Sequence, residues 1–364
     1  MRFINEQAIQ DIATGASLLG AGGGGDPYIG KLMALSAVEK YGPVQLLDVT
    51  EVPDDALTIA SSMMGAPSVF VEKFPRGDEY EQLFAKLRCF LGQDIFATYP
   101  IEAGGINSMI PIAVAARLGL PMVDCDSMGR AFPELQMSTF SIYGIEATPL
   151  AITDEKGNVG ILDTISNSWT EKIARAMTVQ MGATSSMCIF PIKGRDLKKT
   201  CVKKIVTYSE NIGKTIRELS KKKGVTIQTL LDVTGGHHIL SGKVTDVSRI
   251  TKGGFNYGKT IIEGIDDDKN KQAEILFQNE NIALKRNGEV VATAPDLICL
   301  VDFETLTPMT NEGLKYGKRV HIIGLPCDPQ WRTQKGIELV GPRYFGYDLD
   351  YVPIEKLCKK GAHE

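Results

Sequence analysis

The feature that most constrains the fold of this chain is a run of four glycines within LLGAGGGGDP, residues 18–27. Glycine loses more backbone freedom on folding than any other residue, so an ordered glycine run indicates a backbone path or a close contact that other residues would not allow. Apolar residues recur at helical spacing on both sides of the run, in NEQAIQDIATGASLL and PYIGKLMALSAVEKY. The run therefore joins two predicted helices.

This context excludes a nucleotide-binding loop. Such a loop follows a strand and opens a helix, and it carries either the GK[ST] ending of a Walker loop or GxGxxG within a βαβ unit. Two interpretations remain for the glycine run. It is either a tight structural turn or a loop whose backbone N–H groups bind an anion or a polarised carbonyl.

The residues that follow the glycines favour the binding interpretation. Asp26 and Pro27 are typical of a helix start, with an acid as N-cap and proline at the first helical position. A helix N-terminus carries partial positive charge and attracts anions. The predicted substrate-binding residues of this loop are Gly22, Gly23, Gly24, Gly25 and Asp26.

Composition excludes several classes of protein. The 364 residues carry 40 Lys and Arg against 44 Asp and Glu, without a long block of one sign, so we expect no nucleic-acid binding. We find neither a signal peptide nor an apolar run long enough to span a bilayer, so we expect a cytoplasmic protein that binds no membrane. The seven cysteines are dispersed without a CxxC pair, which favours reduced thiols over disulfides.

The first half of the chain reads as an α/β domain. Predicted strands alternate with predicted helices such as DEYEQLFAKLRCFLG, which is typical of βαβ units, so we expect three layers with a mainly parallel sheet. Parallel sheets bind ligands beyond the carboxyl ends of their strands. Three predicted strands run there into loops of glycines, acids and amides, namely MGAPS, IEAGGIN and SMGRAFPE. These loops and the glycine run are expected to form one cleft.

The second half of the chain has a different pattern of predicted secondary structure, with strands predominating over helices. Short β-rich runs with glycine and asparagine turns, such as NYGKTIIEGI and EVVATAPDLICLVD, predict a β domain that is either a sandwich of two sheets or a barrel. We therefore divide the chain into an α/β domain over residues 1–165, a connecting helix and linker over 166–200, and a β-rich domain over 201–364.

Two aspartates at a strand end are candidate catalytic groups. Alternation along a strand places Asp124 and Asp126 on one face, where mutual repulsion would raise one pKa toward the range of a general acid or base, or the pair could hold a cation. The alternative is a capped turn in which Asp126 binds the backbone and Asp124 pairs with Arg130. Arg130 is also a candidate for substrate binding. The flanking acids disfavour Cys125 as a nucleophile.

The loop IEAGGIN supplies a third candidate carboxylate. Glu102 could orient or deprotonate a bound ring, while Gly104 and Gly105 would let a ligand approach the backbone and Asn107 would donate or accept a hydrogen bond. The alternative is a plain helix start capped by Asn107.

Histidines are few, at positions 237, 238, 321 and 363. His237 and His238 point to opposite faces if they lie on a strand, so a metal would receive only one of them. Either could bind a divalent metal such as zinc together with Asp124 or Asp126. We expect His321 to be a core residue and His363 to belong to a disordered tail.

Taken together, five motifs resemble one family. GAGGGGDPY, IEAGGIN, LPMVDCDSMGRAFPELQM, TGGHH and ELVGPRYFGYDLDYVP are similar, in this order and over almost the whole chain, to the S-methyl thiohydantoin desulfurase family. The resemblance implies an α/β amino-terminal domain, a barrel-like carboxy-terminal domain and removal of sulfur from a thiohydantoin ring during breakdown of sulfur-containing histidine derivatives. It also implies a link to hydantoinase or oxoprolinase partners.

This chemistry requires a base for water, donors for developing negative charge, and an acid or metal for the sulfur. We assign the base or cation holder to Asp124 and Asp126, ring-carbonyl binding to the glycine amides and Asn107, and the acid or ligand to His237 or His238. Two other functions stay open. The chain could be a non-catalytic or regulatory subunit that binds a cyclic amide or partners a hydantoinase or oxoprolinase, or it could be a metal-dependent cyclic amide hydrolase. With any of these functions, the chain could form a homo-oligomer.

Overall fold

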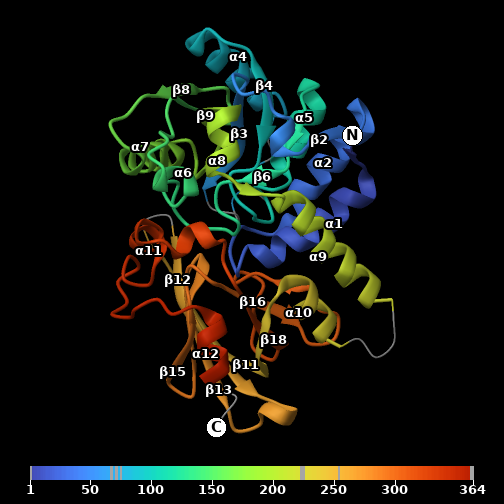
Figure 1. The fold of residues 1–364 in the computed structure, drawn as a ribbon, viewed down its shortest axis with the longest axis vertical. Coiled ribbons are helices and arrows are strands. Elements are labelled where there is room, and N and C mark those ends of the chain that lie inside the picture. Colours follow the sequence, from blue (N-terminus) through green and yellow to red (C-terminus); the bar gives the residue numbers. More distant parts are fainter. Residues whose placement is uncertain are drawn as a thin grey trace.

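The computed structural model of the chain describes residues 2–65, 69, 73, 76–221, 226–252 and 255–360. Figure 1 shows two halves, each built on a large sheet, with the carboxy-terminal half below the amino-terminal half. His363 lies outside the described residues.

The amino-terminal half contains an eight-stranded mixed sheet in the order β1-β2-β5-β4-β3-β9-β7-β8. Only β2–β5, β5–β4 and β4–β3 pair in parallel, and the other four described pairings are antiparallel. The prediction of a mainly parallel sheet was therefore wrong. The strands are β1 Arg2–Ile4, β2 Val44–Leu47, β3 Leu57–Gly65, β4 Ile95–Tyr99, β5 Met122–Val123, β7 Leu150–Thr153, β8 Val159–Leu162 and β9 Thr184–Lys193.

The reason lies in the hairpin β7–β8 and the strand β9 that follows helix α7. β9 returns beside β3 in the opposite direction, and β7 pairs with β9 on its other side, so this edge of the sheet is antiparallel. The helices that precede the carboxy-terminal sheet in the chain are α1 Glu6–Leu19, α2 Pro27–Tyr41, α4 Glu79–Leu91, α5 Ile110–Leu118, α6 Thr139–Ile142, α7 Asn167–Gln180, α8 Gly194–Thr200, α9 Ile205–Leu219 and α10 Gln228–Thr234.

The predicted helices on both sides of the glycine run are present. Asn5 caps α1 by accepting a hydrogen bond from Ala8 N at 2.9 Å. Asp26 caps α2 by accepting one from Tyr28 N at 2.8 Å, with Pro27 at the first helical position. The glycine run therefore connects two capped helices, as the sequence predicts.

The carboxy-terminal half contains an antiparallel eight-stranded sheet in the order β15-β14-β13-β12-β11-β18-β16-β17. The outer strands β15 and β17 do not pair with each other among the described residues, so the sheet is not a closed barrel and the barrel-like prediction was wrong. The strands are β11 His237–Lys252, β12 Phe255–Gly264, β13 Gln272–Gln278, β14 Glu280–Arg286, β15 Glu289–Thr293, β16 Leu297–Asp302, β17 Pro308–Met309 and β18 Arg319–Leu325.

The sheet nevertheless curls. Asn281 at the start of β14 donates a hydrogen bond from Nδ2 to Ile298 O on β16 at 2.8 Å, although the two strands are not neighbours in the sheet. The remaining elements are β6 Cys125–Asp126 and β10 Val202–Lys203, which pair with each other, η1 Val49–Glu51, η2 Asp266–Asp268, η3 Pro329–Arg332, α11 Gln334–Val340 and α12 Ile354–Lys360.

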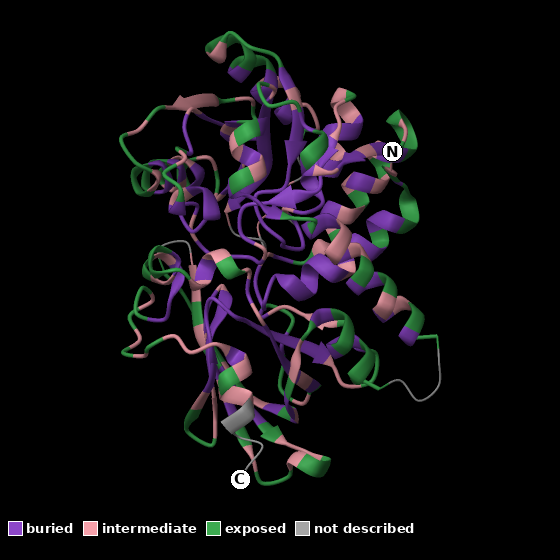
Figure 2. Ribbon diagram, viewed as in Figure 1, coloured by how far each residue is buried: buried purple, intermediate pink, exposed green. Residues whose placement is uncertain are grey.

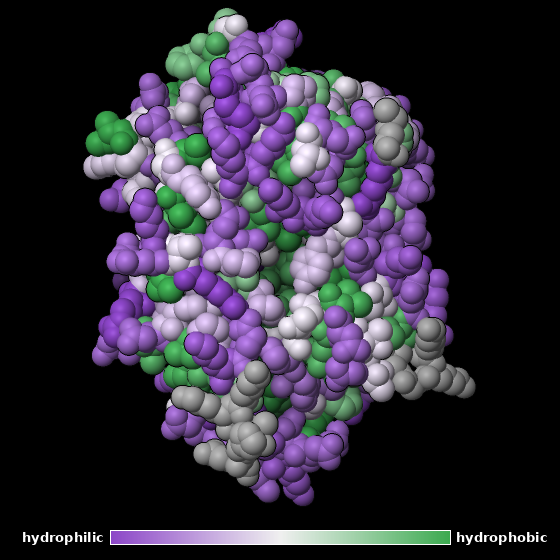
Figure 3. All heavy atoms as spheres, viewed as in Figure 1, coloured by the Kyte–Doolittle hydropathy of each residue, from purple (hydrophilic) through white to green (hydrophobic). Residues whose placement is uncertain are grey.

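The two halves share a hydrophobic core. One cluster of buried residues extends from Ile12 of α1 to Leu325 of β18 and Trp331 of η3. The Trp331 ring packs edge-on against Phe132 at 5.2 Å between centroids, and its Nε1 donates to Met128 O at 2.7 Å. Figure 2 shows buried segments continuing from one half into the other, and Figure 3 shows a depression between the halves with hydrophobic atoms inside it. Burial of this shared apolar surface holds the halves together.

Candidate functional site

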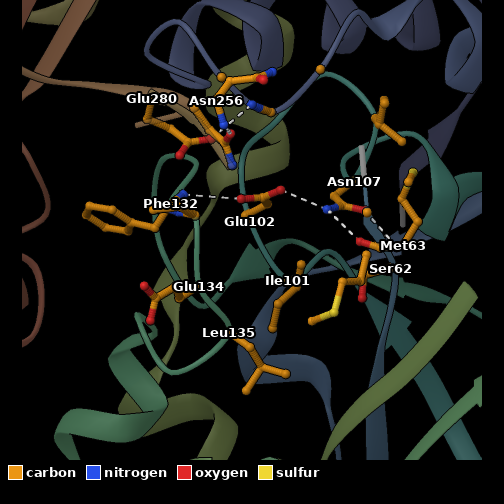
Figure 4. Close-up of a pocket in the computed structure, with 18 of the residues that line it drawn as sticks. Ser62, Met63, Ile101, Glu102, Asn107, Phe132, Glu134, Leu135, Asn256 and Glu280 are labelled. Carbon is orange, nitrogen blue, oxygen red and sulfur yellow. Dashed lines mark hydrogen bonds between the residues drawn. The ribbon is translucent and has the colours of Figure 1, made fainter. Parts of the chain in front are cut away.

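A cavity of about 130 Å³ is lined by residues of both halves. Its walls come from the glycine run, the end of β3, the loops after β4 and β6, and the carboxy-terminal sheet (Figure 4). The residues that line it include Gly22, Gly23, Gly24, Gly25, Ser62, Met63, Met64, Glu102, Asn107, Met128, Phe132, Glu134, Glu171, Arg175, Met187, Arg249, Asn256, Asn279, Glu280 and Asn311.

Backbone hydrogen bonds fix the glycine run between the two halves. Gly22 O accepts from Asn311 N at 2.7 Å, which ties the run to the carboxy-terminal half. Gly24 O accepts from Ile106 N at 3.0 Å, which ties it to the loop after β4. The run is thus a bridge as well as a cavity wall.

Two of the glycines are required by close approach. A Cβ on Gly23 would lie 2.0 Å from Glu280 Oε1, and a Cβ on Gly24 would lie 2.7 Å from the Cα of Gly104. Gly24 also has a φ of +70°, in the left-handed region that favours glycine. The structural interpretation of the run therefore accounts for these positions, and the run also lines the cavity.

Glu102 lies in the loop after β4 and is buried, with 7% of its surface exposed. Its Oε1 accepts a hydrogen bond from Asn107 Nδ2 at 2.7 Å, and its Oε2 accepts one from Phe132 N at 3.3 Å, as Figure 4 shows. Burial raises the pKa of Glu102 to about 7, although both hydrogen bonds and the nearby Arg130 favour the ionised form. This carboxyl group can therefore change its protonation state near neutral pH.

Glu280 opens β14 and reaches the cavity from the other half, with 3% of its surface exposed. Its Oε1 accepts a hydrogen bond from Gly24 N at 3.2 Å. Its Oε2 is buried and has no hydrogen-bond partner within the described residues. Burial, together with repulsion from Glu102, raises the pKa of Glu280 to about 8.

Glu102 and Glu280 thus form a pair of buried carboxyl groups from different halves of the chain. Near neutral pH, the group with the lower pKa can lose its proton while the other keeps one. An ionised carboxylate beside a protonated carboxylic acid can act as general base and general acid on the same ligand. The cavity therefore contains two carboxyl groups whose pKa values burial raises toward neutral pH.

The other predicted residues of the IEAGGIN loop lie at the site. Asn107 lines the cavity, donating to Glu102 and accepting from Met63 N through Oδ1 at 2.9 Å. Gly104 and Gly105 pack against the glycine run, where a Cβ on Gly105 would lie 2.2 Å from Gly25 O. Asp26 is exposed and caps α2. The structure therefore brings together the glycine run, Glu102 and Asn107.

The structure does not bring Asp124 or Asp126 into the cavity. Asp124 caps α9, where its Oδ1 accepts from Val206 N and Thr207 N at 3.0 Å each. The carboxylate of Asp126 accepts from Gly129 N at 2.8 Å and from Met128 N at 3.2 Å. Both carboxylates thus accept hydrogen bonds from backbone N–H groups, as the capped-turn alternative predicts. The difference is that Asp124 binds the first turn of α9 and not Arg130.

Arg130 is fully buried, and its guanidinium group donates hydrogen bonds to backbone carbonyls instead of lining the cavity. Its Nη1 donates to Pro295 O at 2.9 Å and to Asp296 O at 2.8 Å, and its guanidinium lies 4.5 Å from the centroid of the Phe132 ring. Arg130 therefore joins the loop after β6 to the carboxy-terminal half. The predicted role in substrate binding does not fit this position, because its donors face backbone carbonyls.

The three histidines of the described ranges, His237, His238 and His321, also lie outside the cavity. His237 and His238 begin β11, and His238 Nε2 lies 2.9 Å from Ser241 Oγ. Ser241 Oγ is also 2.8 Å from His321 Nδ1, and the His321 ring stacks on Phe303. His321 is partly buried rather than a full core residue.

The described ranges contain no group of three His, Cys, Asp or Glu side chains that could hold a metal ion. The carboxylates of Asp124 and Asp126 accept hydrogen bonds from backbone N–H groups, and a metal site that joins one of them to His237 or His238 stays a prediction. Burial raises the pKa of the Cys125 thiol, which opposes its use as a nucleophile.

Sequence reasoning missed Glu280 and the arginines of the cavity. Glu280 occurs in FQNENIALK, which reads as an ordinary turn followed by a strand. Arg175 of α7 pairs with Glu171, and Arg249 of β11 donates to Leu314 O at 2.7 Å. No local motif marks these positions, because they meet the cavity only through the packing of the two halves.

Comparison with known proteins defines the class. The description "S-Me-THD-like, N-terminal domain" matches residues 7–164, and "S-Me-THD-like, C-terminal domain" matches residues 165–354. The chain therefore belongs to the S-Me-THD-like family, which confirms the resemblance to S-methyl thiohydantoin desulfurases. This assignment supports an enzyme with a thiohydantoin-related function.

A crystal structure of a protein from Chromobacterium violaceum has the same fold. It is 21% identical, with a TM-score of 0.82, and the match covers 97% of this chain and all of that one. No protein with curated annotation matches the chain. Among the described residues, no helix combines the length and apolar character needed to cross a membrane.

Proposed function

We propose that this protein desulfurises a thiohydantoin-type ring by hydrolysis, replacing the sulfur substituent of a ring carbon with oxygen and releasing a thiol or sulfide. The observation that carries the proposal is the pair of buried carboxyl groups, Glu102 and Glu280, in one cavity of a chain that belongs to the S-Me-THD-like family. Their pKa values of about 7 and about 8 suit one base and one acid near neutral pH.

For an S-methyl thiohydantoin, the first step adds water to the C=N carbon that carries sulfur. Ionised Glu102 takes a proton from water, the water oxygen bonds to the carbon, and protonated Glu280 gives its proton to the ring nitrogen as the C=N bond opens. The product of this step is a tetrahedral carbon that holds hydroxyl, sulfur and nitrogen.

The second step expels the sulfur. Ionised Glu280 takes the hydroxyl proton as C=O forms, the C–S bond breaks, and Glu102 returns its proton to the sulfur. One water is consumed, its oxygen and one hydrogen remaining on the ring and its other hydrogen leaving with the thiol. Both carboxyl groups recover their starting protonation states.

Other side chains would position the ring. Asn107 holds Glu102 through its Nδ2 hydrogen bond, and the glycine run presents backbone to the ligand. The substrate in this proposal is a sulfur-containing histidine derivative after ring closure. A hydantoinase or oxoprolinase that accepts the hydantoin product is the proposed partner in a cytoplasmic pathway.

The test is a screen of thiohydantoins and S-methyl thiohydantoins with purified protein, followed by measurement of thiol or sulfide and of the ring product. We expect one equivalent of hydantoin for each equivalent of thiol. Ring opening without sulfur release would instead identify a cyclic amide hydrolase. Binding without any turnover would identify the non-catalytic subunit, and either result would overturn the proposal.

A further inference from the structure

The cavity has two chemically different walls that arise from different halves of the chain. One wall contains Asn256, Asn279 and Asn311 of the carboxy-terminal half, and we call it the amide wall. The other contains Met64, Met128 and Met187 of the amino-terminal half, which belong to one buried cluster, and we call it the methionine wall. Figure 4 shows Glu102 with Asn256 and Glu280 on one side and Asn107 on the other.

The amide wall offers both donors and an acceptor. Asn311 Nδ2 donates to Asn279 O at 2.8 Å and to Asn281 Oδ1 at 2.9 Å, which fixes the orientation of its amide. Its Oδ1 is buried without a hydrogen-bond partner within the described residues. A buried oxygen in this position costs free energy until a donor reaches it, so it is suited to a ligand N–H.

The donors of this wall come from the other two asparagines. Asn279 Oδ1 accepts from Asn256 N at 2.9 Å, and Asn256 Oδ1 accepts from Thr251 Oγ1 at 2.7 Å. These bonds leave the Nδ2 groups of Asn256 and Asn279 without an acceptor among the described residues. Amide donors beside an acceptor match a ring edge in which a carbonyl alternates with N–H.

The methionine wall has the opposite character. Its three side chains are buried, with exposed fractions of 3–6%. Methionine is flexible and polarisable, so this wall fits a sulfur atom or a methylthio group better than it fits a polar ring edge. Neighbouring strands β3 and β9 supply two of its three members, Met64 and Met187.

We propose that the cavity binds the ring in one orientation, with its –CO–NH– edge on the amide wall and its sulfur substituent on the methionine wall. This inference rests on the proposed function, and it names Asn256, Asn311 and Met187 as specificity-determining residues. In this orientation the carbon that carries sulfur lies next to Glu102, at the boundary between the walls.

The test measures binding by calorimetry, with Glu102→Gln as the background that prevents turnover. The ligands are hydantoin, hydantoin methylated on the nitrogen between its two carbonyls, and S-methyl thiohydantoin. We expect the N-methyl group to weaken binding about tenfold, the equivalent of about 1.4 kcal/mol or one lost hydrogen bond. We also expect the S-methyl ring to bind more tightly than hydantoin.

Two variants then separate the walls. Asn256→Ala should weaken the binding of hydantoin and of S-methyl thiohydantoin by a similar factor of roughly five to ten. The control Thr251→Ala removes the hydroxyl that contacts Asn256 but no donor of the amide wall, so it should weaken the binding of neither ring. Met187→Gln should reduce the preference for the S-methyl ring by roughly fourfold, the equivalent of one buried methyl group, and should change hydantoin binding little.

The opposite pattern would overturn the orientation. If Asn256→Ala changed the preference for sulfur and Met187→Gln did not, the ring would lie the other way round. Equal binding of the N-methylated and unmethylated rings would also refute it. The proposed function can fail separately, because all these ligands could bind as expected while the unmodified protein released no thiol.

Discussion

Replacing Glu280 by glutamine should change the pH dependence of the reaction in a defined way. In the unmodified protein the active form has Glu102 ionised and Glu280 protonated. Turnover should therefore rise with pH through about 7 and fall again through about 8, the pKa values to which burial raises these groups. Glu280→Gln removes the acid, so the fall at high pH should disappear and turnover should drop by about 100-fold or more.

The same substitution should stabilise the fold at high pH. A carboxyl group whose folded pKa exceeds its unfolded value binds protons more readily in the folded state, so stability falls as pH rises from 4.5 toward about 8. Each pKa unit corresponds to about 1.4 kcal/mol, so ionised Glu280 destabilises the fold by several kcal/mol as an upper bound. Glutamine carries no charge and can still accept the hydrogen bond from Gly24 N.

Two measurements across the neutral pH range check this prediction: the initial rate of thiol release, and the free energy of unfolding obtained from urea titrations. Glu289→Gln is the matched control, because Glu289 is an exposed carboxylate at the start of β15. A Glu280→Gln protein that kept both limbs of the pH profile would refute the assignment of Glu280 as the acid. If turnover of the unmodified protein did not depend on pH across this range, the assignment of Glu102 and Glu280 as base and acid would be refuted.

Three further substitutions test the structural roles. Asp124→Ala should cost about 1 kcal/mol of stability, the usual effect of a lost helix cap, and should leave turnover per folded molecule unchanged in combined melting and rate measurements. Gly23→Ala should push Glu280 aside, because its Cβ would lie 2.0 Å from Oε1, so turnover should fall about as far as in Glu280→Gln while stability falls by about 1–3 kcal/mol. Arg130→Lys should lower the unfolding free energy by about 3 kcal/mol or more in urea titrations, because buried carbonyls lose their donors; an unchanged midpoint would contradict the buried position of Arg130.

The local features of the sequence predicted much of the amino-terminal half. Helix periodicity and capping residues such as Asn5 and Asp26 act over a few neighbouring positions, so the two helices around the glycine run were predictable. Strand direction was not predictable in the same way. The antiparallel course of β9 depends on how a distant segment returns to the sheet, and alternation of strands and helices alone does not encode it.

The site shows the same division between local and long-range information. Glu102, Asn107 and the glycine run occur in conspicuous loops, and the structure places them together at the cavity. Asp124 and Asp126 are equally conspicuous in the sequence, but their carboxylates accept hydrogen bonds from backbone N–H groups of helix α9 and of a tight turn. Glu280 lacked any local signal, because its burial arises only when the curled carboxy-terminal sheet closes over the glycine run.

The central claim is tested most directly by following the ring oxygen. The purified protein is incubated with an S-methyl thiohydantoin in water labelled with heavy oxygen, and the ring product is examined by mass spectrometry while methanethiol is quantified. The account predicts one labelled oxygen in an intact hydantoin ring for each thiol released, and loss of both signals in Glu102→Gln. An opened ring that retains its sulfur, or labelled hydantoin formed at an undiminished rate by Glu102→Gln, would contradict it.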